Sequence, residues 1–138
     1  MYYFNSSAAT AIFITNNAGD LLVVRRAKEP AKGTYDLPGG FVDLYETAEE
    51  AIIREVKEET NLQISAPDYL FSLPNLYLYS GFEVHTVDLF YQYSMDAFPA
   101  LQAGDDAESL FFLKKEIIQP ESFGLLSIRQ GVKKWMMQ

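Results

Sequence analysis

The chain has 138 residues, 49% of them hydrophobic, and its 19 acidic against 11 basic residues give a net charge of -8. This size fits one domain with its own core, residues 1–138, and the acidic balance argues against a nucleic-acid surface. The absence of cysteine and the single histidine exclude disulfides and most zinc sites. No apolar run approaches the roughly 18 residues of a membrane span and no signal-peptide pattern is present, so we expect a cytoplasmic protein.

The first third of the chain predicts a β-hairpin followed by a loop. Residues 8–15 are rich in apolar and β-favouring side chains, and a turn cluster separates them from residues 21–25, the returning strand. Residues 28–38 lack periodicity and contain two prolines and a glycine. They predict a loop with a short strand near residues 35–37, which leads to the glycine pair at 39–40.

The next element is predicted to be a helix from Ala48 to about Thr60. Thr47 followed three residues later by Glu50 is the pattern of a capping box, which marks a helix start. One face of this helix carries the apolar side chains expected to anchor it: Ala48, Ala51, Ile52, Ile53 and Val56.

The second half of the chain predicts three strands and a final helix. Pro67 and Pro74 bracket a strand candidate, and residues 82–95 and 111–113 are β-rich runs. A C-terminal helix is indicated by an apolar stripe at helical spacing, which we expect to pack on the core: Leu125, Ile128, Val132, Trp135 and Met136. Strands interleaved with two helices predict an α/β fold with a mixed β-sheet between helices, an α/β/α sandwich.

Three glutamates of the first helix, Glu55, Glu58 and Glu59, lie at positions i, i+3 and i+4 and share a face of about 100°. Like charges at this spacing cost a helix roughly a few tenths of a kcal/mol each. A divalent cation removes the repulsion, and Mg²⁺ or Mn²⁺ is commonly held by carboxylates together with substrate phosphates. The pattern favours a metal site for a phosphate compound. A solvated acidic face with an Arg54–Glu58 pair is the alternative.

A longer pattern surrounds these glutamates. Gly40 is followed after five residues by Glu46, and after seven more by the run Arg54-Glu55-Val56-x-Glu58-Glu59-x-Asn61-Leu62. The pattern resembles the signature of the Nudix hydrolases, which cleave nucleoside diphosphates linked to another group, at eight of nine defined positions. The departure is Asn61, where the family usually has glycine, and asparagine also tolerates a left-handed helix terminus. The resemblance implies the same α/β/α fold.

The resemblance also implies roles for individual residues. The Gly40 carbonyl would join Glu55, Glu58 and Glu59 as a ligand of Mg²⁺ or Mn²⁺. Glu46 would pair with Arg54 and brace the helix that carries the ligands. Simple surface exposure of Glu46 is the alternative.

A second acidic cluster lies ahead of the strand candidate at residues 111–113. Nudix enzymes of the NADH-pyrophosphatase type often place another metal-binding acid in a comparable loop, which makes Asp106 a catalytic candidate with Glu108 close behind. A charged turn without a role in catalysis is the alternative. The general base is either Glu58 or an acid of this loop. We interpret His85 as a strand residue without a catalytic role.

Features that bear on the substrate are fewer. Four basic residues lie within residues 25–32, and Arg25 or Arg26 is the best candidate to bind phosphate. Surface solubility is the alternative explanation for any one of them. Aromatic candidates to stack a nucleobase are Tyr3, Phe4, Tyr77 and Tyr79. The opening Tyr-Tyr-Phe-Asn resembles the segment that follows a zinc ribbon in NADH-pyrophosphatase-like members, although the ribbon's cysteines are absent here.

These observations predict a metal-dependent pyrophosphohydrolase acting on a small nucleotide, with NADH or ADP-ribose favoured. Dinucleoside polyphosphates and nucleoside triphosphates are alternative substrates, and a non-catalytic nucleotide-sensing domain is an alternative function. A homodimer is expected by analogy alone.

Overall fold

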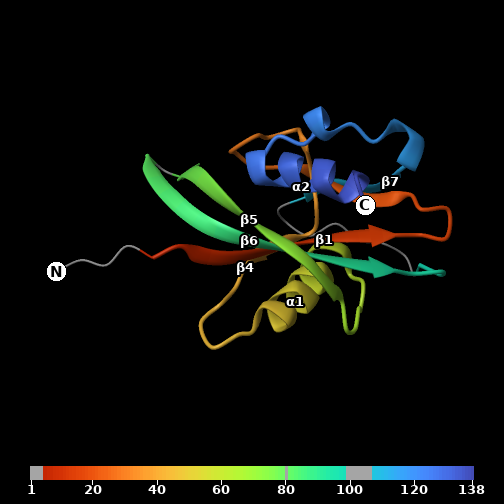
Figure 1. Cartoon of the computed structure of the whole chain (residues 1–138), viewed down its shortest axis with the longest axis horizontal. Coiled ribbons are helices and arrows are strands. Elements are labelled where there is room, and N and C mark those ends of the chain that lie inside the picture. Colours follow the sequence, from red (N-terminus) through yellow and green to blue (C-terminus); the bar gives the residue numbers. More distant parts are fainter. Residues whose placement is uncertain (1–4, 80, 99–106) are drawn as a thin grey trace.

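The computed structural model describes residues 5–79, 81–98 and 107–138 (Figure 1). Two helices and seven strands make up its main elements. The helices are α1 (Ala48–Thr60) and α2 (Leu126–Met136). The strands are β1 (Ser7–Thr15), β2 (Leu21–Arg26), β3 (Tyr35–Asp36), β4 (Gly39–Phe41), β5 (Asp68–Tyr79), β6 (Phe82–Ser94) and β7 (Ala107–Leu113). Two short 3-10 turns, Lys115–Ile117 and Pro120–Ser122, lead from β7 to α2.

The strands form one mixed sheet centred on β1. Strand β1 pairs in parallel with β6 along its whole length, and β6 pairs antiparallel with the edge strand β5. On its other side β1 pairs with β4 over Ala9–Ala11 but with β2 only at Thr15. Strand β2 continues outward to β3 and β7. The sheet therefore opens between β4 and β2, and this opening positions the site described below.

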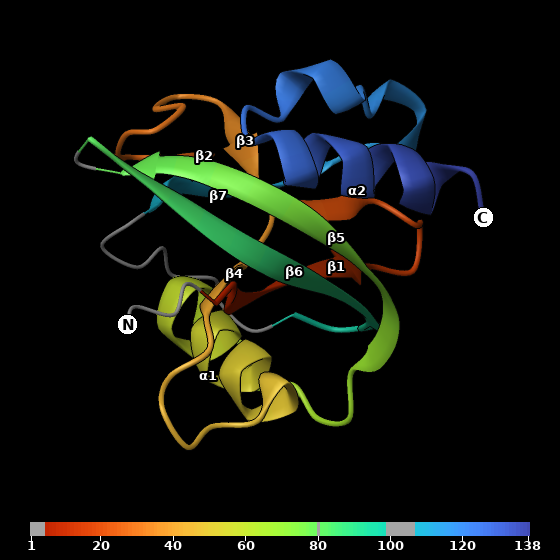
Figure 2. The same cartoon turned by 60° about the vertical axis from the view of Figure 1, so that its left-hand side comes forward.

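The helices cover opposite faces of the sheet, α1 on one side and α2 on the other (Figures 1 and 2). Alternate residues of β1 serve the two faces, as the two-residue period of a strand requires. Phe13 packs in the core on the α2 side and stacks on Trp135, with ring centroids 4.7 Å apart. Ile12 and Ile14 pack on the α1 side with Ile52. The predicted α/β/α sandwich with a mixed sheet is confirmed.

Helix α1 has the limits that the sequence predicts. The Thr47 side chain accepts from the Glu50 backbone N–H at 3.1 Å, and the Glu50 carboxylate accepts from the Thr47 backbone N–H at 2.9 Å, which completes the capping box. At the other end Asn61 has φ 65° and ψ 11°, the left-handed conformation. Asparagine therefore fills the position where the signature usually has glycine without breaking the chain reversal.

The left-handed Asn61 gives a stability prediction. We expect Asn61→Ala to lower the free energy of unfolding by about 1 kcal/mol, because a Cβ without a compensating polar group is strained at this φ. Asn61→Gly is the matched control, and it should cost less because glycine adopts this conformation freely. Urea unfolding of both variants measures the difference. Equal stability of the alanine and glycine variants would contradict the explanation.

Other sequence expectations need correction. The sequence predicts a strand that ends at Pro74, but β5 runs through this residue. Strand β5 is an edge strand, where a proline is tolerated because its nitrogen need not donate to a neighbouring strand. Strand β4 was not predicted at all. The helical spacing predicts Met136 on the buried stripe of α2, but this residue is 45% exposed, whereas Ile128 and Val132 are buried. No helix in the described part of the chain is long and apolar enough to cross a membrane.

Candidate active site

The glycine pair lets helix α1 approach the sheet closely. Gly40 lies opposite Thr10 in the β1–β4 ladder, and the Thr10 hydroxyl donates to the Gly40 carbonyl at 3.1 Å. A Cβ on Gly40 would lie 2.6 Å from the Glu55 carboxyl group, well inside van der Waals contact. Only glycine at position 40 therefore allows the Glu55 carboxyl group to rest against the backbone of β4.

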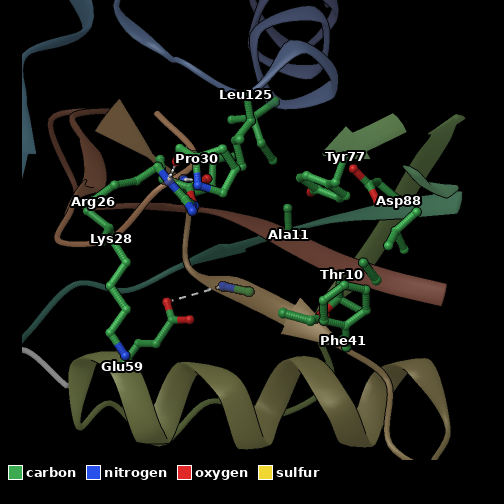
Figure 3. A pocket seen from close by; sticks show the side chains of 18 of the residues that line it. Thr10, Ala11, Arg26, Lys28, Pro30, Phe41, Glu59, Tyr77, Asp88 and Leu125 are labelled. Carbon is green, nitrogen blue, oxygen red and sulfur yellow. Dashed lines mark hydrogen bonds and ion pairs between the residues drawn. The ribbon is translucent and has the colours of Figure 1, made fainter. Parts of the chain in front are cut away.

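Glu55 and Glu59 form a largely buried acidic pair next to these glycines. The two carboxyl groups lie close enough to interact through their side chains. The Gly39 N–H donates to Glu59 Oε2 at 3.4 Å (Figure 3). Burial raises the pKa of Glu59 well above its ordinary value, and the negative charges of Asp36 and Glu55 raise it further. Burial also raises the pKa of Glu55. The pair is thus a place where added positive charge is favoured.

Arg54 connects the third glutamate to the residues that precede the helix. Its guanidinium donates to both Glu46 oxygens, at 2.8 and 3.0 Å, to Glu55 at 2.9 Å and to Glu58 at 3.2 Å. It also donates to the Phe41 carbonyl at 3.1 Å. These contacts fix the Glu55 side chain and the β4–α1 connection together. The hydrogen bonds from Arg54 lower the pKa of Glu46 to about 2.

Glu58 differs from the other two glutamates in being 59% exposed, against 16% for Glu55. Its carboxylate points to Arg54 on the outer side of α1. Within the described residues, no three Asp, Glu or His side chains are gathered closely enough to hold a metal ion unaided. The structure therefore brings the Glu55 and Glu59 side chains together, whereas the Glu58 side chain is exposed and contacts Arg54.

The donor set nevertheless fits a hard divalent cation. It consists of carboxylate oxygens and the Gly40 carbonyl oxygen, which are the ligand atoms that Mg²⁺ and Mn²⁺ prefer. The two partly buried carboxyl groups gain a compensating charge when a cation binds. Such ions also keep several waters and take phosphate oxygens as ligands, so a site that is incomplete without substrate is expected.

A cleft of about 650 Å³ begins at Glu59 and Gly40 and is lined by residues of both parts of the sheet (Figure 3). Gly39, Gly40 and Glu59 line it, together with residues of β1, β2, β5, β6, α2 and the loop after β2. Arg26 reaches into it and pairs with Asp36 at 2.7 Å. Lys28 extends along the same side toward α1 (Figure 3).

The two arginines proposed to bind phosphate lie in different places. Arg26 lines the cleft, where its guanidinium also donates to the Pro30 carbonyl at 2.7 Å. Arg25 does not line the cleft, because it lies over the Tyr35 ring, 5.0 Å from the centroid, and donates to the Gly33 carbonyl. Arg25 therefore has a packing role in this structure, and Arg26 stays the candidate.

Several sequence candidates lie outside the described residues. Asp106, Tyr3 and Phe4 are among them, and the side chains of Glu108 and Tyr79 are likewise not described. Tyr77, the remaining stacking candidate, does line the cleft, with its ring 6.5 Å from that of Phe41.

The structure adds residues that the sequence did not single out. Asp36 and Asp88 line the cleft, and Asp88 is only 2% exposed. Burial raises the pKa of Asp36 in spite of its partner Arg26. A signal for Asp88 was present, since it follows Val84 and Thr86 at the alternate positions of a β-rich run and an acidic residue there interrupts the pattern.

The NUDIX domain family matches residues 5–136, so this chain belongs to the Nudix family. The ADP-ribose pyrophosphatase of Methanocaldococcus jannaschii is 55% identical over 42 residues, which are 30% of this chain and 25% of that protein. The mitochondrial NAD(P)H pyrophosphatase NUDT13 of Homo sapiens is 36% identical over 70 residues, which are 51% of this chain and 20% of that protein. The chain thus spans a quarter or less of the length of these curated relatives.

Solved structures support the fold. The NUDIX domain of Shewanella oneidensis NrtR, in complex with ADP ribose, has a TM-score of 0.77 at 18% identity. The match covers 96% of this chain and 90% of that one. At this identity the likeness concerns the fold.

Proposed function

We propose that this chain hydrolyses the pyrophosphate bond of a nucleoside diphosphate derivative, with ADP-ribose or NADH as the favoured substrate and Mg²⁺ or Mn²⁺ as cofactor. The observation that carries the proposal is the partly buried pair of Glu55 and Glu59 beside Gly40, with Glu59 lining a cleft large enough for a nucleotide. Two carboxyl groups forced together in a largely buried position favour a bound cation.

The glutamates of α1 and Gly40 are assigned to metal binding and to proton transfer. Glu55, Glu59 and the Gly40 carbonyl would hold the cation from the sheet side, and Glu58 would complete the set from the exposed side. A cation bound there supplies neutralisation of the diphosphate charge and lowers the pKa of a water molecule. Glu58 is the carboxylate with access to solvent, so we assign it the role of accepting the proton from the attacking water, with Asp106 as the alternative base.

The remaining charged residues position these groups and the substrate. Arg54 donates hydrogen bonds to Glu46, Glu55 and the Phe41 carbonyl, so it fixes the position of the Glu55 carboxylate relative to strand β4. Arg26 and Lys28 would attract the phosphates into a cleft whose floor is acidic.

The choice of substrate rests on the relatives. The segment 55% identical to this chain belongs to a protein named as an ADP-ribose pyrophosphatase, and a second relative is named as an NAD(P)H pyrophosphatase. Dinucleoside polyphosphates and nucleoside triphosphates contain the same kind of bond and stay as alternatives. The proposal also carries the expectations of a cytoplasmic location, small nucleotides as partners, and a homodimer by analogy.

Nucleotide sensing without catalysis is the second candidate function. It is favoured by the fold likeness to a NUDIX domain that was crystallised with ADP ribose. The presence of all three glutamates together with the Gly40 cradle argues for hydrolysis, because binding of a nucleotide alone does not require a buried acidic pair.

A substrate panel tests the proposal. ADP-ribose, NADH, diadenosine polyphosphates and nucleoside triphosphates are incubated with Mg²⁺, Mn²⁺ or EDTA, and released mononucleotide or phosphate is quantified. We expect AMP from ADP-ribose or NADH with either metal and none with EDTA. Binding of a nucleotide without product formation in either metal would replace hydrolysis by sensing.

A further inference from the structure

The cleft has two chemically different ends. One end carries the groups suited to a diphosphate, namely Gly39, Glu59, Arg26 and Lys28. The other end lies toward α2 and is lined mostly by apolar side chains, with Thr10, Tyr77 and Asp88 among its polar residues. Figure 3 shows Lys28 and Glu59 on one side of the cleft and Tyr77 and Asp88 on the other, with Thr10 and Ala11 nearer the latter pair. The apolar residues are Ala11, Val84, Leu125 and Ile128.

Asp88 is a carboxylate built into the apolar end. It is buried in the middle of β6, and it accepts hydrogen bonds from two hydroxyl groups, Thr86 Oγ1 at 2.7 Å and Ser127 Oγ in α2. A carboxylate has about four lone-pair directions, so two hydroxyl donors leave acceptor capacity directed to other groups. Each of the two Asp88 oxygens has one hydroxyl donor, and a further donor bound in this end of the cleft would use the remaining lone-pair directions.

The charge of Asp88 also decides which part of a nucleotide fits there. Burial, followed by the charge of Asp88, raises the pKa of Tyr77 to about 12, so the phenol stays neutral beside it. A phosphate would be repelled by the same charge. A neutral group that carries N–H donors on a flat apolar body is attracted, and a purine base meets this description. The rings of Tyr77 and Phe41 supply aromatic surface for stacking.

We propose that Asp88 accepts a hydrogen bond from the amino group of a purine base and thereby selects amino-bearing nucleotides over those without one. The inference rests on the proposed function for the position of the diphosphate at the opposite end of the cleft. It makes Asp88 a specificity-determining residue of the same site. The amino group could be that of adenine or that of guanine, and the experiment separates these two sources.

The test compares nucleotides that differ only in the base. Affinities for ADP, GDP and IDP are measured by calorimetry on the Glu59→Gln variant, so that turnover does not interfere. We expect IDP to bind about tenfold or more weakly than the better of ADP and GDP, because the inosine base lacks the amino donor of either. The tighter of ADP and GDP identifies the source of the amino group.

Asp88→Asn on the same background should reduce that preference to about threefold or less, because the amide can turn its own N–H toward a base carbonyl. Asp68→Asn is the matched control. It removes the same charge from an exposed position at the start of β5, outside the cleft, and should retain the full preference.

Two results with Asp88→Asn would contradict the role of Asp88. A preference that persists in Asp88→Asn, or an equal loss of affinity for all three nucleotides, would overturn the proposal. If circular dichroism shows that Asp88→Asn does not fold, the affinities of the Glu59→Gln variant with Asp88 intact test the proposal. Binding of IDP as tight as that of ADP and GDP would overturn it, because Asp88 would then not select for the amino group. Since no turnover is measured, failure of the hydrolysis assay would reject the proposed function without bearing on this result.

Discussion

Replacing Glu58 by glutamine is expected to lower kcat for the hydrolysed nucleotide by about 10² or more and to leave the melting temperature nearly unchanged. The side chain is 59% exposed, and its contact with Arg54 is an i,i+4 pair at 3.2 Å. Such exposed pairs contribute roughly 0.3–0.5 kcal/mol, so little stability is lost. The amide cannot accept a proton from water and is a weaker metal ligand than a carboxylate. The substitution should therefore slow the hydrolysis step, which lowers kcat.

Steady-state kinetics at saturating metal, together with calorimetric melting, measure the two effects. Glu49→Gln is the matched control, because it makes the same change at an exposed position in the first turn of the same helix. Its kcat should stay within about twofold of that of the unsubstituted chain, as for a surface change far from the chemistry. Unchanged turnover by Glu58→Gln would remove this residue from the mechanism and leave Asp106 as the candidate base.

Local signals in the sequence predicted the helix that carries the site with its correct limits. The capping box at Thr47 and the left-handed Asn61 involve only neighbours along the chain, so no tertiary contact is needed to recognise them. The three glutamates and the Arg54–Glu46 pair lie within this same stretch, and the structure shows the pair. The catalytic roles of these residues remain predictions.

Features that depend on distant parts of the chain were not predictable. Strand β4 is three residues long and exists because it pairs with β1, about thirty residues away in sequence. Alternation put Arg25 and Arg26 on opposite faces, but which of them meets the cleft depends on the packing of β2 against β7, whose register shifts between these two residues. One of the two hydroxyl groups that donate to Asp88 belongs to Ser127, 39 residues further along the chain.

The difference between the buried and exposed glutamates leads to the second prediction. Glu59→Gln should abolish most activity, as a lost ligand would, and yet raise the stability of the metal-free protein at neutral pH. The Glu59 carboxyl group has a raised pKa because it is buried and lies near Asp36 and Glu55. Glutamine keeps the shape and removes the charge. A change that relieves a buried like-charge contact is worth on the order of 1 kcal/mol, or roughly 3–5 °C in melting temperature.

The sign of the pH dependence follows from the same raised pKa. The folded state binds the Glu59 proton more tightly than the unfolded state, so the stabilisation is complete below the ordinary pKa of 4.5 and is lost as the pH rises through the higher pKa of the folded state. The metal-free protein should therefore melt at progressively lower temperature as the pH rises above about 5. Glu59→Gln should flatten this decline without removing it, because Glu55 and Asp36 also have raised pKa values.

Metal binding should act against the same repulsion. Addition of Mg²⁺ or Mn²⁺ at pH 8 is expected to raise the melting temperature of the unsubstituted chain, since a ligand that binds only the folded state stabilises it. The increase should be much smaller for Glu59→Gln and should survive in Glu49→Gln. A metal-induced shift of the same size in Glu59→Gln would show that the cation binds elsewhere. A lower melting temperature of the metal-free Glu59→Gln protein would show that the Glu55–Glu59 pair stabilises the fold. There would then be no repulsion between the two carboxyl groups for a cation to reduce.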